Sequence, residues 1–471
     1  MKVSLLIPPH SYVTKMGTHT LGLSYIAAVL EENGHEVEII DAVIENLNWN
    51  DFEKRMKKSN PDIIGITCDT NSRFRVYESA KRLKKIFDDD VPIVVGGPHA
   101  TFTDVDILKY IDAIDFVVRG EGEYTMLELI NALEKNNPMK EIRGISYRKN
   151  GQIVRNEPGP PVLNLDELPY PARHLLPLEK YKSKLEGSYD IECTSAIFSR
   201  GCPNLCVFCS ESHFWGKRYR FNSPSRVIDE INMIINEYGF KAIDFWDSTF
   251  NAIPKWTMKV CNKIIEEKLD FKWYARVRVN LVNRELLKTM KKAGCVALGV
   301  GIESGSPNIL KKINKNITIQ QIMKFAELCK DMDFFVKFFF MLNLPGETFD
   351  DIKMTFNMIK KLEGMSDKFI CPTAYTQIYP GTELEMLARK EGKLPKDFSW
   401  SLPYFNSRNL IVNENPEIPL YENIKIEDLL AFLYKQNKES ITLKNILNKL
   451  IKIRSIQDLK ILIKKGILYI K

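Results

Sequence analysis

The sequence predicts an α/β protein in which a parallel-sheet domain is followed by a second run of alternating strands and helices. Short apolar runs alternate with helical patterns over residues 1–135, and the same alternation returns over residues 191–395. Wholly apolar runs are typical of strands that helices cover on both faces, which is the environment of a parallel sheet. A third observation, three cysteines within residues 202–209, marks the start of the second run.

Composition limits the class of protein. A chain of 471 residues with 44% apolar side chains can bury more than one core. The net charge of +7 is uneven, because residues 421–471 hold 11 Lys+Arg and 5 Asp+Glu, which leaves +1 for residues 1–420. A nearly neutral body argues against a protein that coats nucleic acid, whose basic residues spread over the binding domain. The basic tail leaves open a contact with something acidic.

The first domain is expected to be an open sheet of five strands. Helices are predicted between them, of which Leu21–Glu32, with Gly34 just past its end, is the clearest. A helix is also expected over Tyr124–Leu133 after the fifth strand. The five apolar runs that we assign to strands are Val3–Ile7, Val37–Ile40, Asp62–Thr67, Ile93–Val95 and Phe116–Val118.

Glycines gather where these strands end. Gly96-Gly97-Pro98-His99 follows the fourth strand, and Arg119-Gly120-Glu121-Gly122-Glu123 follows the fifth. Ligands of parallel sheets bind beyond the carboxyl ends of the strands, and glycine permits a close approach of the backbone. Tight turns alone would explain the same glycines. No G-x-G-x-x-G follows the first strand, so a ligand lying across several strand ends fits better than a dinucleotide.

A connector is expected over residues 141–190. Its first part, Ile145–Val154, alternates around Asn150-Gly151, which is a strong hairpin signal. The proline-rich stretch Glu157–Pro177 then indicates a stiff linker.

The strongest chemical signal is the loop of Cys202, Cys206 and Cys209, spaced C-x-x-x-C-x-x-C after the apolar strand Ala196–Phe198. Three thiolates on one loop can bind three irons of a cubane cluster and leave the fourth iron open. Zinc is the alternative, but no fourth Cys or His stands at zinc-finger spacing, and His213 is the nearest nominee. Cys193 is interpreted as a packed thiol.

This spacing, with Phe208 before the third cysteine, resembles the radical SAM superfamily. The chain continues with five further predicted strands, which with Ala196–Phe198 make the open partial (β/α)6 TIM barrel typical of that superfamily. These strands are Ile243–Trp246, Trp273–Val277, Val296–Ile302, Val336–Met341 and Ala374–Ile378.

The superfamily resemblance implies a site for S-adenosylmethionine on the open iron of a 4Fe–4S cluster. Residues at the carboxyl ends of barrel strands line such sites. The residues implied in holding S-adenosylmethionine are Asp247, Glu303, Ser304, Pro345 and Gly346. One departure is Asn343, which stands where the superfamily commonly has glycine before Leu-Pro-Gly-Glu.

The pairing of the two domains resembles the cobalamin-binding radical SAM enzymes over about residues 1–395. The resemblance implies a Rossmann-like (flavodoxin-like) cobalamin-binding domain at residues 1–140, a linker at 141–190, a radical SAM core at 191–395 and a mostly helical segment at 396–471. The corrin would lie on the strand ends of the first domain. Its implied contacts are Thr67, Cys68, Asp69, Thr70, Gly96, Gly97, Pro98, His99, Gly120, Glu121, Gly122 and Glu123.

The D-x-H-x-x-G motif, which supplies a histidine to cobalt in many cobalamin proteins, is absent, and His10 and His19 occupy the corresponding loop. We therefore expect no histidine from that motif on cobalt.

The family resemblance implies an enzyme that reductively cleaves S-adenosylmethionine to a 5′-deoxyadenosyl radical. With cobalamin as methyl donor, the leading hypothesis is a methyltransferase acting on a carbon of a small molecule or a lipid or pigment precursor. A cyclase or ring-rearranging enzyme of the same family is the alternative. A tRNA methylthiotransferase would need three more cysteines in the first domain, which has only Cys68. A non-catalytic iron–sulfur protein remains as the last alternative.

The resemblance also implies an external one-electron reductant of the flavodoxin or ferredoxin type, and no nucleic acid is expected as a partner. Nine cysteines without a signal peptide or a run of 18 apolar residues predict a reduced, cytoplasmic protein.

In the C-terminal segment, Trp400, Tyr404 and Phe405 form either a lid or a packed connector. Helices are expected at Ile424–Tyr434 and Leu443–Ile453. The basic, apolar stretch Asp458–Ile470 is a helix that either docks on the barrel or lies at a membrane surface.

Overall fold

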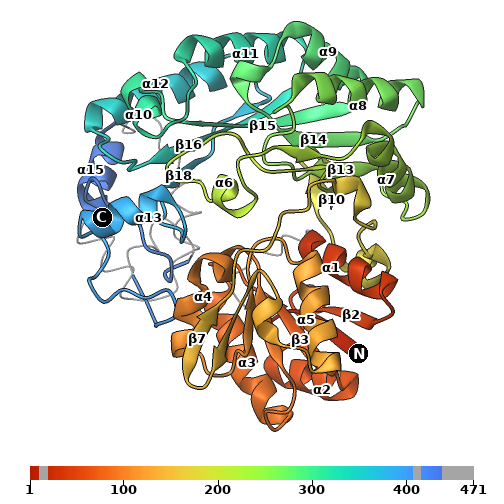
Figure 1. Cartoon of the computed structure of the whole chain (residues 1–471). Coiled ribbons are helices and arrows are strands. Elements are labelled where there is room, and N and C mark those ends of the chain that lie inside the picture. The colour runs from red at the N-terminus through yellow and green to blue at the C-terminus, as the bar shows by residue number, and fades with distance from the viewer. Residues whose placement is uncertain (10–19, 407–414, 437–471) are drawn as a thin grey trace.

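The chain is represented by a computed structural model that describes residues 1–9, 20–406 and 415–436 (Figure 1). It contains two large sheets, and the second lies above the first in the view of Figure 1. The prediction of a parallel-sheet domain followed by a second β/α domain is confirmed. The described strands of the second sheet run along one path from β10 to β17, with β18 beside β16, and the path does not close into a full barrel.

The first sheet has the strand order β2-β1-β3-β4-β5-β6-β7, and its first five strands are parallel. The order 2-1-3-4-5 is that of flavodoxin-like doubly wound sheets. The seven strands are β1 (Lys2–Ile7), β2 (Glu36–Asp41), β3 (Ile63–Thr67), β4 (Ile93–Gly96), β5 (Phe116–Val118), β6 (Ile145–Lys149) and β7 (Gln152–Arg155).

Helices cover both faces of this sheet, which explains why its strands are apolar throughout. Adjacent residues of β1 show this, because Leu5 packs into the core on one face and Leu6 into the core on the other. The covering helices are α1 (Leu21–Glu32), α2 (Trp49–Ser59), α3 (Arg73–Ile86), α4 (Pro98–Tyr110) and α5 (Glu123–Lys135).

The hairpin of β6 and β7 belongs to the first sheet. Its turn residues Asn150 and Gly151 have φ of 50° and 75°, the conformation that favours Asn-Gly in tight hairpins. β6 pairs antiparallel with β5, so the segment that the sequence analysis placed in the connector extends the sheet by two strands.

The rest of the connector binds the two halves together. The guanidinium of Arg173, which is almost fully buried, donates to the carbonyl of Ser195 at 2.7 Å and to Glu230 at 3.1 Å. The hydroxyl of Tyr181 donates to Asp41 of the first sheet at 2.9 Å. A small hairpin of β8 (Lys184–Leu185) and β9 (Ser188–Glu192) follows.

The second sheet is entirely parallel. Its first strand ends at Ala196, two residues before the end that the sequence predicts, and Phe198 already lies in the loop beyond it. Its strands are β10 (Thr194–Ala196), β13 (Ala242–Phe245), β14 (Lys272–Arg276), β15 (Cys295–Glu303), β16 (Phe335–Leu342), β17 (Phe369–Ile370) and β18 (Thr373–Tyr375). A separate pair, β11 (Ser199–Arg200) and β12 (Arg220–Phe221), flanks the cysteine loop.

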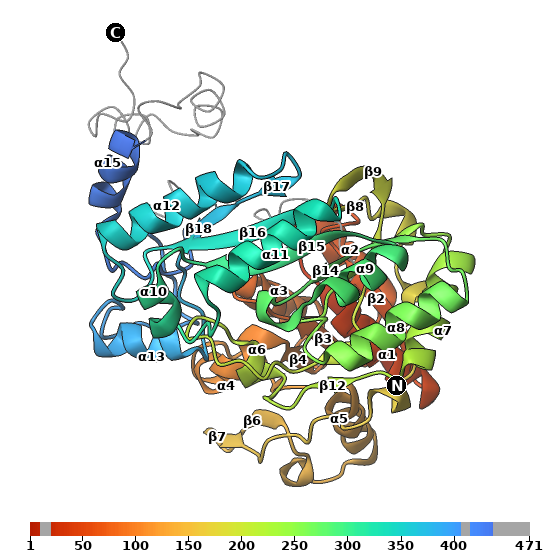
Figure 2. The same cartoon turned by 90° about the horizontal axis from the view of Figure 1, so that it is seen from above.

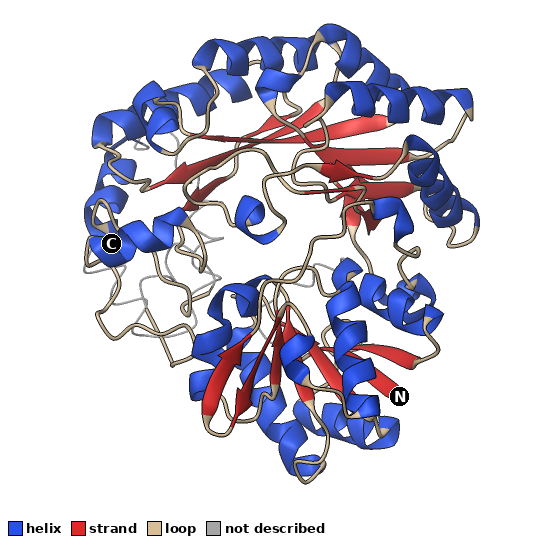
Figure 3. Ribbon diagram, in the orientation of Figure 1, coloured by secondary structure: helices blue, strands red, loops and turns tan. Residues whose placement is uncertain are grey.

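Helices pack on the outer face of this curved sheet and leave its inner face toward the first domain (Figures 1 and 3). Figure 2 shows several of them from above. Capping boxes at Thr318 and Thr348 start two of them. The helices are α7 (Pro224–Asn236), α8 (Pro254–Glu266), α9 (Arg284–Lys292), α11 (Ile319–Asp331) and α12 (Phe349–Glu363).

Four further α-helices are described: α6 (Glu211–Phe214), α10 (Pro307–Lys312), α13 (Glu383–Lys390) and α15 (Ile426–Gln436). α15 lies within two residues of the helix expected at 424–434. The helix predicted at Leu443–Ile453 and the basic stretch Asp458–Ile470 lie outside the described residues, as do His10 and His19. In the described part of the chain, no helix is long and apolar enough to cross a membrane.

Candidate functional site

The three cysteines lie on the loop between β11 and α6, which Figure 1 shows between the second sheet and the first domain. Gly201 gives this loop its start, because its φ is +96° and a Cβ there would collide with the carbonyl oxygen of Arg218. The amide of Cys202 donates to the carbonyl of Gly216 at 3.3 Å. The loop therefore doubles back on residues 216–218 before it reaches the other two cysteines.

The thiols of this loop form one electrostatic group. The pKa of the Cys209 thiol is raised to about 12, chiefly by burial and in smaller part by the carboxyl of Glu211 and the thiols of Cys206 and Cys202, while the backbone amide of Glu211 lowers it. Within the described ranges, no three His, Cys, Asp or Glu side chains are arranged to hold a single metal ion. The donor set fits an iron–sulfur cluster, in which the three thiolates bind different irons and the positive irons favour deprotonation.

The alternative ligands named from the sequence lie elsewhere. His213 is exposed on α6. Cys193 is 4% exposed and packs with Leu185, Ala242 and Tyr274 at the start of the second sheet. Both placements agree with a site built on the three loop cysteines.

Asp247, directly after β13, reaches back to the residues that precede the cysteine loop. Its Oδ1 accepts from the hydroxyl of Ser199 and, at 3.3 Å, from the amide of Phe198. Its Oδ2 is buried and has no hydrogen-bond partner among the described residues. Burial raises the pKa of Asp247 to about 7. An unpaired buried carboxylate oxygen near the cysteine loop offers an acceptor to a ligand with a positively charged amine.

Glu303 is the last residue of β15 and Ser304 follows it, and their side chains have different surroundings. Glu303 has φ of +71°, and its carboxylate accepts from the ammonium of Lys315 at 2.7 Å. Gly301 leaves room for this pair, because a Cβ there would meet the Glu303 carboxylate and the Lys315 ammonium. Ser304 is fully buried, and its hydroxyl lies 3.2 Å from that of Thr355, which makes it part of the protein interior.

The turn from Asn343 to Glu347 follows β16. The Glu347 carboxylate accepts from the amides of Asn343 and Leu344 at 2.6 and 3.1 Å, and burial raises its pKa to about 7. Asn343 has φ of +68° and Gly346 has φ of +66°. Asparagine tolerates this left-handed conformation better than other side chains do, which explains why it can stand where the superfamily commonly has glycine.

On the first domain, the predicted contact residues lie at the carboxyl ends of β3, β4 and β5. Gly97 has φ of +98°, and a Cβ there would lie 2.9 Å from the carbonyl oxygen of Cys68. Close packing of two loops therefore requires this glycine. Among the described residues, a Cβ on Gly120 would meet no atom within 4 Å, so the described chain leaves open space beside the backbone after β5.

His99 does not offer a free nitrogen to a ligand. It is 1% exposed, its Nδ1 lies 3.1 Å from the hydroxyl of Thr70, and its Nε2 lies 3.3 Å from that of Tyr77. Burial lowers the pKa of His99 well below its ordinary value, so the ring is neutral. The His99 ring therefore has an internal hydrogen-bonding role, and contact of residue 99 with a cofactor stays a prediction.

Glu121 and Glu123 also have protein partners that the sequence analysis missed. Arg200 pairs with Glu121 at 2.8 Å and with Glu123 at 2.5 Å, and Arg220 pairs with Glu121 at 2.7 Å. All four side chains are at most 5% exposed. Their carboxylates therefore join the two domains beside the cysteine loop, and the predicted contact of these residues with a ligand stays a prediction.

Comparison with known proteins finds a matching family for each of the two domains. Residues 13–130 match the model of the B12 binding domain, and residues 196–359 match that of the radical SAM superfamily. An uncharacterized methyltransferase of Pyrococcus horikoshii is 41% identical over 388 residues, which cover 82% of each chain. The anaerobic magnesium-protoporphyrin IX monomethyl ester cyclase of Rubrivivax gelatinosus is 29% identical over 345 residues, 72% of this chain and 61% of the cyclase.

Among solved structures, the cobalamin-dependent S-adenosylmethionine radical enzyme OxsB, with aqua-cobalamin and S-adenosylmethionine bound, superposes with a TM-score of 0.75. The match has 18% identity and covers 98% of this chain and 70% of OxsB, which establishes a common fold. The resemblance read from the cysteine loop and the glycine-rich strand ends is confirmed, and with it the cofactors: a 4Fe–4S cluster, S-adenosylmethionine and cobalamin. This chain belongs to the cobalamin-binding radical SAM enzymes.

Proposed function

We propose that the chain is a methyltransferase that methylates an unactivated carbon of a small molecule or a lipid-like precursor. The pairing of Arg200 with Glu123 carries this proposal, because it holds the cysteine loop against the strand ends of the cobalamin-binding domain. Sites that face one another allow a carbon activated at one to receive a methyl group at the other. The name of the Pyrococcus horikoshii relative, a methyltransferase, supports the same class of reaction.

The cofactors supply the difficult chemistry, which is reductive cleavage of S-adenosylmethionine and carriage of a methyl group. The chain binds and orients them. Cys202, Cys206 and Cys209 hold the cluster. The free Oδ2 of Asp247 accepts from the amino group of S-adenosylmethionine, and the Pro345-Gly346 turn lies against its adenine.

The strand ends of the first domain hold cobalamin. The support for this placement is the open space beside Gly120 and the position of Thr67, Asp69 and Gly96 at the same edge of the sheet. Cys68 is fully buried, and its amide and carbonyl bond Gly96 and His99, so it supports the two loops from beneath.

The test is anaerobic incubation of the reconstituted enzyme with S-adenosylmethionine deuterated in its methyl group, a reductant and cell extract. A methyltransferase yields a product that carries the label by mass. Cleavage of S-adenosylmethionine with substrate consumption and no labelled product contradicts the proposal.

A cyclase is the second candidate, favoured by the similarity to the Rubrivivax gelatinosus cyclase over most of this chain. The same incubation separates the two, because a cyclase produces 5′-deoxyadenosine and an altered substrate with no deuterated methyl group. The label therefore decides between methylation and ring formation.

The enzyme also needs a one-electron reductant, and a flavodoxin or ferredoxin is the proposed donor. None of the nine cysteines forms a disulfide, which supports the proposal of a reducing, cytoplasmic compartment. Contact of the basic tail with a membrane surface is tested by comparing how full-length and tail-deleted protein sediment with liposomes. Equal sedimentation rejects that contact.

A further inference from the structure

The chain beyond α13 returns to both domains, through residues 398–406 and 415–424, which we call the strap. On the first domain, Arg73 is fully buried and has its guanidinium donating to two strap carbonyls, those of Trp400 at 3.0 Å and Glu417 at 2.5 Å. Asp106 of α4 accepts from the hydroxyl of Ser399 at 2.8 Å. The strap is therefore anchored to the cobalamin-binding domain by buried polar contacts.

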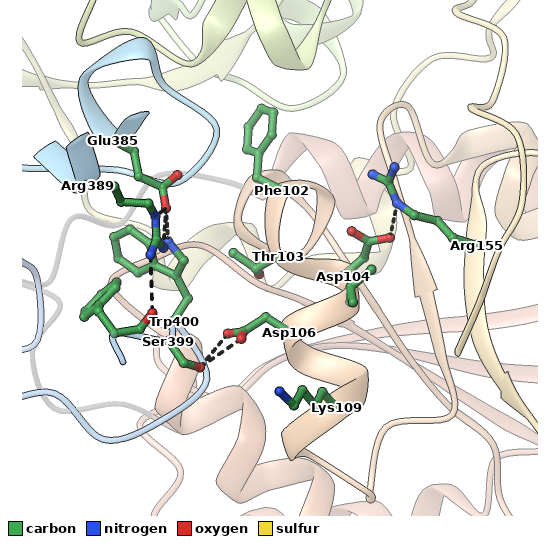
Figure 4. Close-up of a pocket in the computed structure, with 12 residues that line it drawn as sticks. Phe102, Thr103, Asp104, Asp106, Lys109, Arg155, Glu385, Arg389, Ser399 and Trp400 are labelled. Atoms are coloured by element: carbon green, nitrogen blue, oxygen red, sulfur yellow. Dashed lines mark hydrogen bonds and ion pairs between the residues drawn. The ribbon is translucent and has the colours of Figure 1, made fainter. Parts of the chain in front are cut away.

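Asp106, Ser399 and Trp400 line a pocket of about 490 Å³, which Figure 4 shows in close-up. Asp106 points from α4 toward Ser399, and Trp400 lies beside them. The amide of Ser401 also donates to Asp106 at 2.8 Å. Two strap donors, the Ser399 hydroxyl and the Ser401 amide, thus bind one carboxylate and fix this part of the strap against α4.

The strap then runs beside the segment that follows β18. The amide of Ile378 donates to the carbonyl of Pro419 and the amide of Tyr421 donates to that of Thr376, both at 2.9 Å. Gln377 and Leu420 form an antiparallel bridge between these two bonds. The strap thus extends the edge of the second sheet as a short strand-like piece.

The C-terminal end of the strap is hydrogen-bonded to the turn after β16. The side chain of Asn343 donates to the carbonyl of Ile424 at 2.7 Å and accepts from the amide of the same residue at 2.6 Å. The side chain of Asn423 accepts from the amide of Gly346 at 3.2 Å and donates to the carbonyl of Glu347 at 2.6 Å. Four hydrogen bonds join two strap residues to one five-residue turn.

The choice of Asn at position 343 follows from this contact. Glycine would adopt the φ of +68° at no steric cost, but it has no side chain to bond Ile424. Within the turn, the Glu347 carboxylate binds the first two amides, whereas the Gly346 end is held from outside the turn, its amide by Asn423 and its carbonyl by the ammonium of Lys312 at 3.0 Å. The amide of Glu347 also donates to the carbonyl of Leu344 at 3.0 Å, and to these contacts the strap adds four hydrogen bonds, which makes it the largest outside support of the turn.

We propose that the strap positions the Asn343–Glu347 turn for S-adenosylmethionine, with Asn343 and Asn423 as positioning residues. The inference rests on the proposed placement of the Pro345-Gly346 turn against adenine. The strap fixes the turn relative to the first domain through Arg73 and Asp106, and in this way it sets where S-adenosylmethionine lies relative to cobalamin.

The test compares N343G and N423A with the wild-type full-length protein. N343G keeps the left-handed backbone and removes two strap bonds, and N423A removes the other two. Loss of two hydrogen bonds should raise the KM for S-adenosylmethionine about tenfold in reductive cleavage, with kcat changed less than about twofold. Hydrogen exchange of peptides covering residues 335–350 in the cofactor-free protein should speed up by a similar factor. N283G, which removes an Asn cap from α9, is the matched control and should leave both values unchanged.

Unchanged exchange in N343G and N423A overturns the strap as the support of the turn. Faster exchange with an unchanged KM overturns the positioning role. N343D, which keeps one acceptor for the Ile424 amide, should recover part of the KM shift. Because cleavage of S-adenosylmethionine is measured without substrate, a raised KM in an enzyme that transfers no methyl group leaves the strap intact and rejects only the methyltransferase proposal.

Discussion

Arg200 and Glu123 form a buried ion pair, with Nη2 of the arginine 2.5 Å from Oε1 of the glutamate. Arg200 stands two residues before the first cluster cysteine, and Glu123 begins α5 at the strand ends of the cobalamin-binding domain. The aromatic ring of Trp215, after α6, lies 4.9 Å from the same guanidinium. One side chain thus links the cluster loop to the other domain.

Replacing Arg200 by Met should lower the free energy of unfolding by about 3–5 kcal/mol, because it leaves the buried carboxylates of Glu121 and Glu123 with less compensation. Urea denaturation measures this change. The control is R284A, which removes an exposed pair with Asp331 and should cost at most about 1 kcal/mol. Equal losses in the two variants would show that the Arg200 pairs do not hold the domains together.

Asp247 should make stability depend on pH. Burial raises its pKa from the ordinary 3.8 to about 7, so the folded protein binds this proton more tightly than the unfolded chain does. Its stabilising contribution is therefore complete below pH 3.8 and is lost as the pH rises to about 7. D247N cannot titrate, so the free energy of unfolding of wild type relative to D247N should fall between pH 4 and 7 and then level off.

The comparison of wild type with D247N cancels the contributions of other titratable groups to the pH dependence. One of these groups is Glu347, whose pKa burial also raises to about 7. D331N changes an exposed carboxylate and serves as the control. Parallel pH profiles for wild type and D247N would contradict a raised pKa at this position.

Replacing Gly201 by alanine should disturb the cluster loop. In G201A, the new Cβ would strain a φ of +96° and collide with the carbonyl of Arg218, so we expect loss of bound iron after reconstitution and a lower thermal midpoint. G216A is the matched control, since Gly216 has φ of +85° with nothing within 4 Å of its Cβ. It should show only the backbone cost of about 1–2 kcal/mol. Normal iron content in G201A would mean that the loop adapts.

The sequence predicted the positions of the strands along the chain well, because apolar runs and glycine-rich strand ends are local signals. The five strands of the first domain lie where they were expected, and the cysteine loop follows the first strand of the second sheet. The predicted end of that strand was wrong by two residues. Phe198 is as apolar as a strand residue, but it packs into the core from a loop.

Side-chain roles at the site were less predictable, because they depend on partners far away in the chain. Glu123 lies 77 residues from Arg200, and nothing local to R-G-E-G-E distinguishes an ion pair from a ligand contact. The hydrogen bond between Asn343 and Ile424 joins residues that are 81 positions apart in the sequence. The departure from glycine at position 343 was the one local sign of that contact.

The central claim is that Cys202, Cys206 and Cys209 together hold the cluster at which S-adenosylmethionine is cleaved. The direct measurement is iron content and formation of 5′-deoxyadenosine, after anaerobic reconstitution, in each Cys→Ala variant of these three and in C193A. Each of the three variants should lose cluster iron and all cleavage, whereas C193A, which alters a packed thiol, should keep both. Cleavage that persists in any one of the three loop variants would contradict the account.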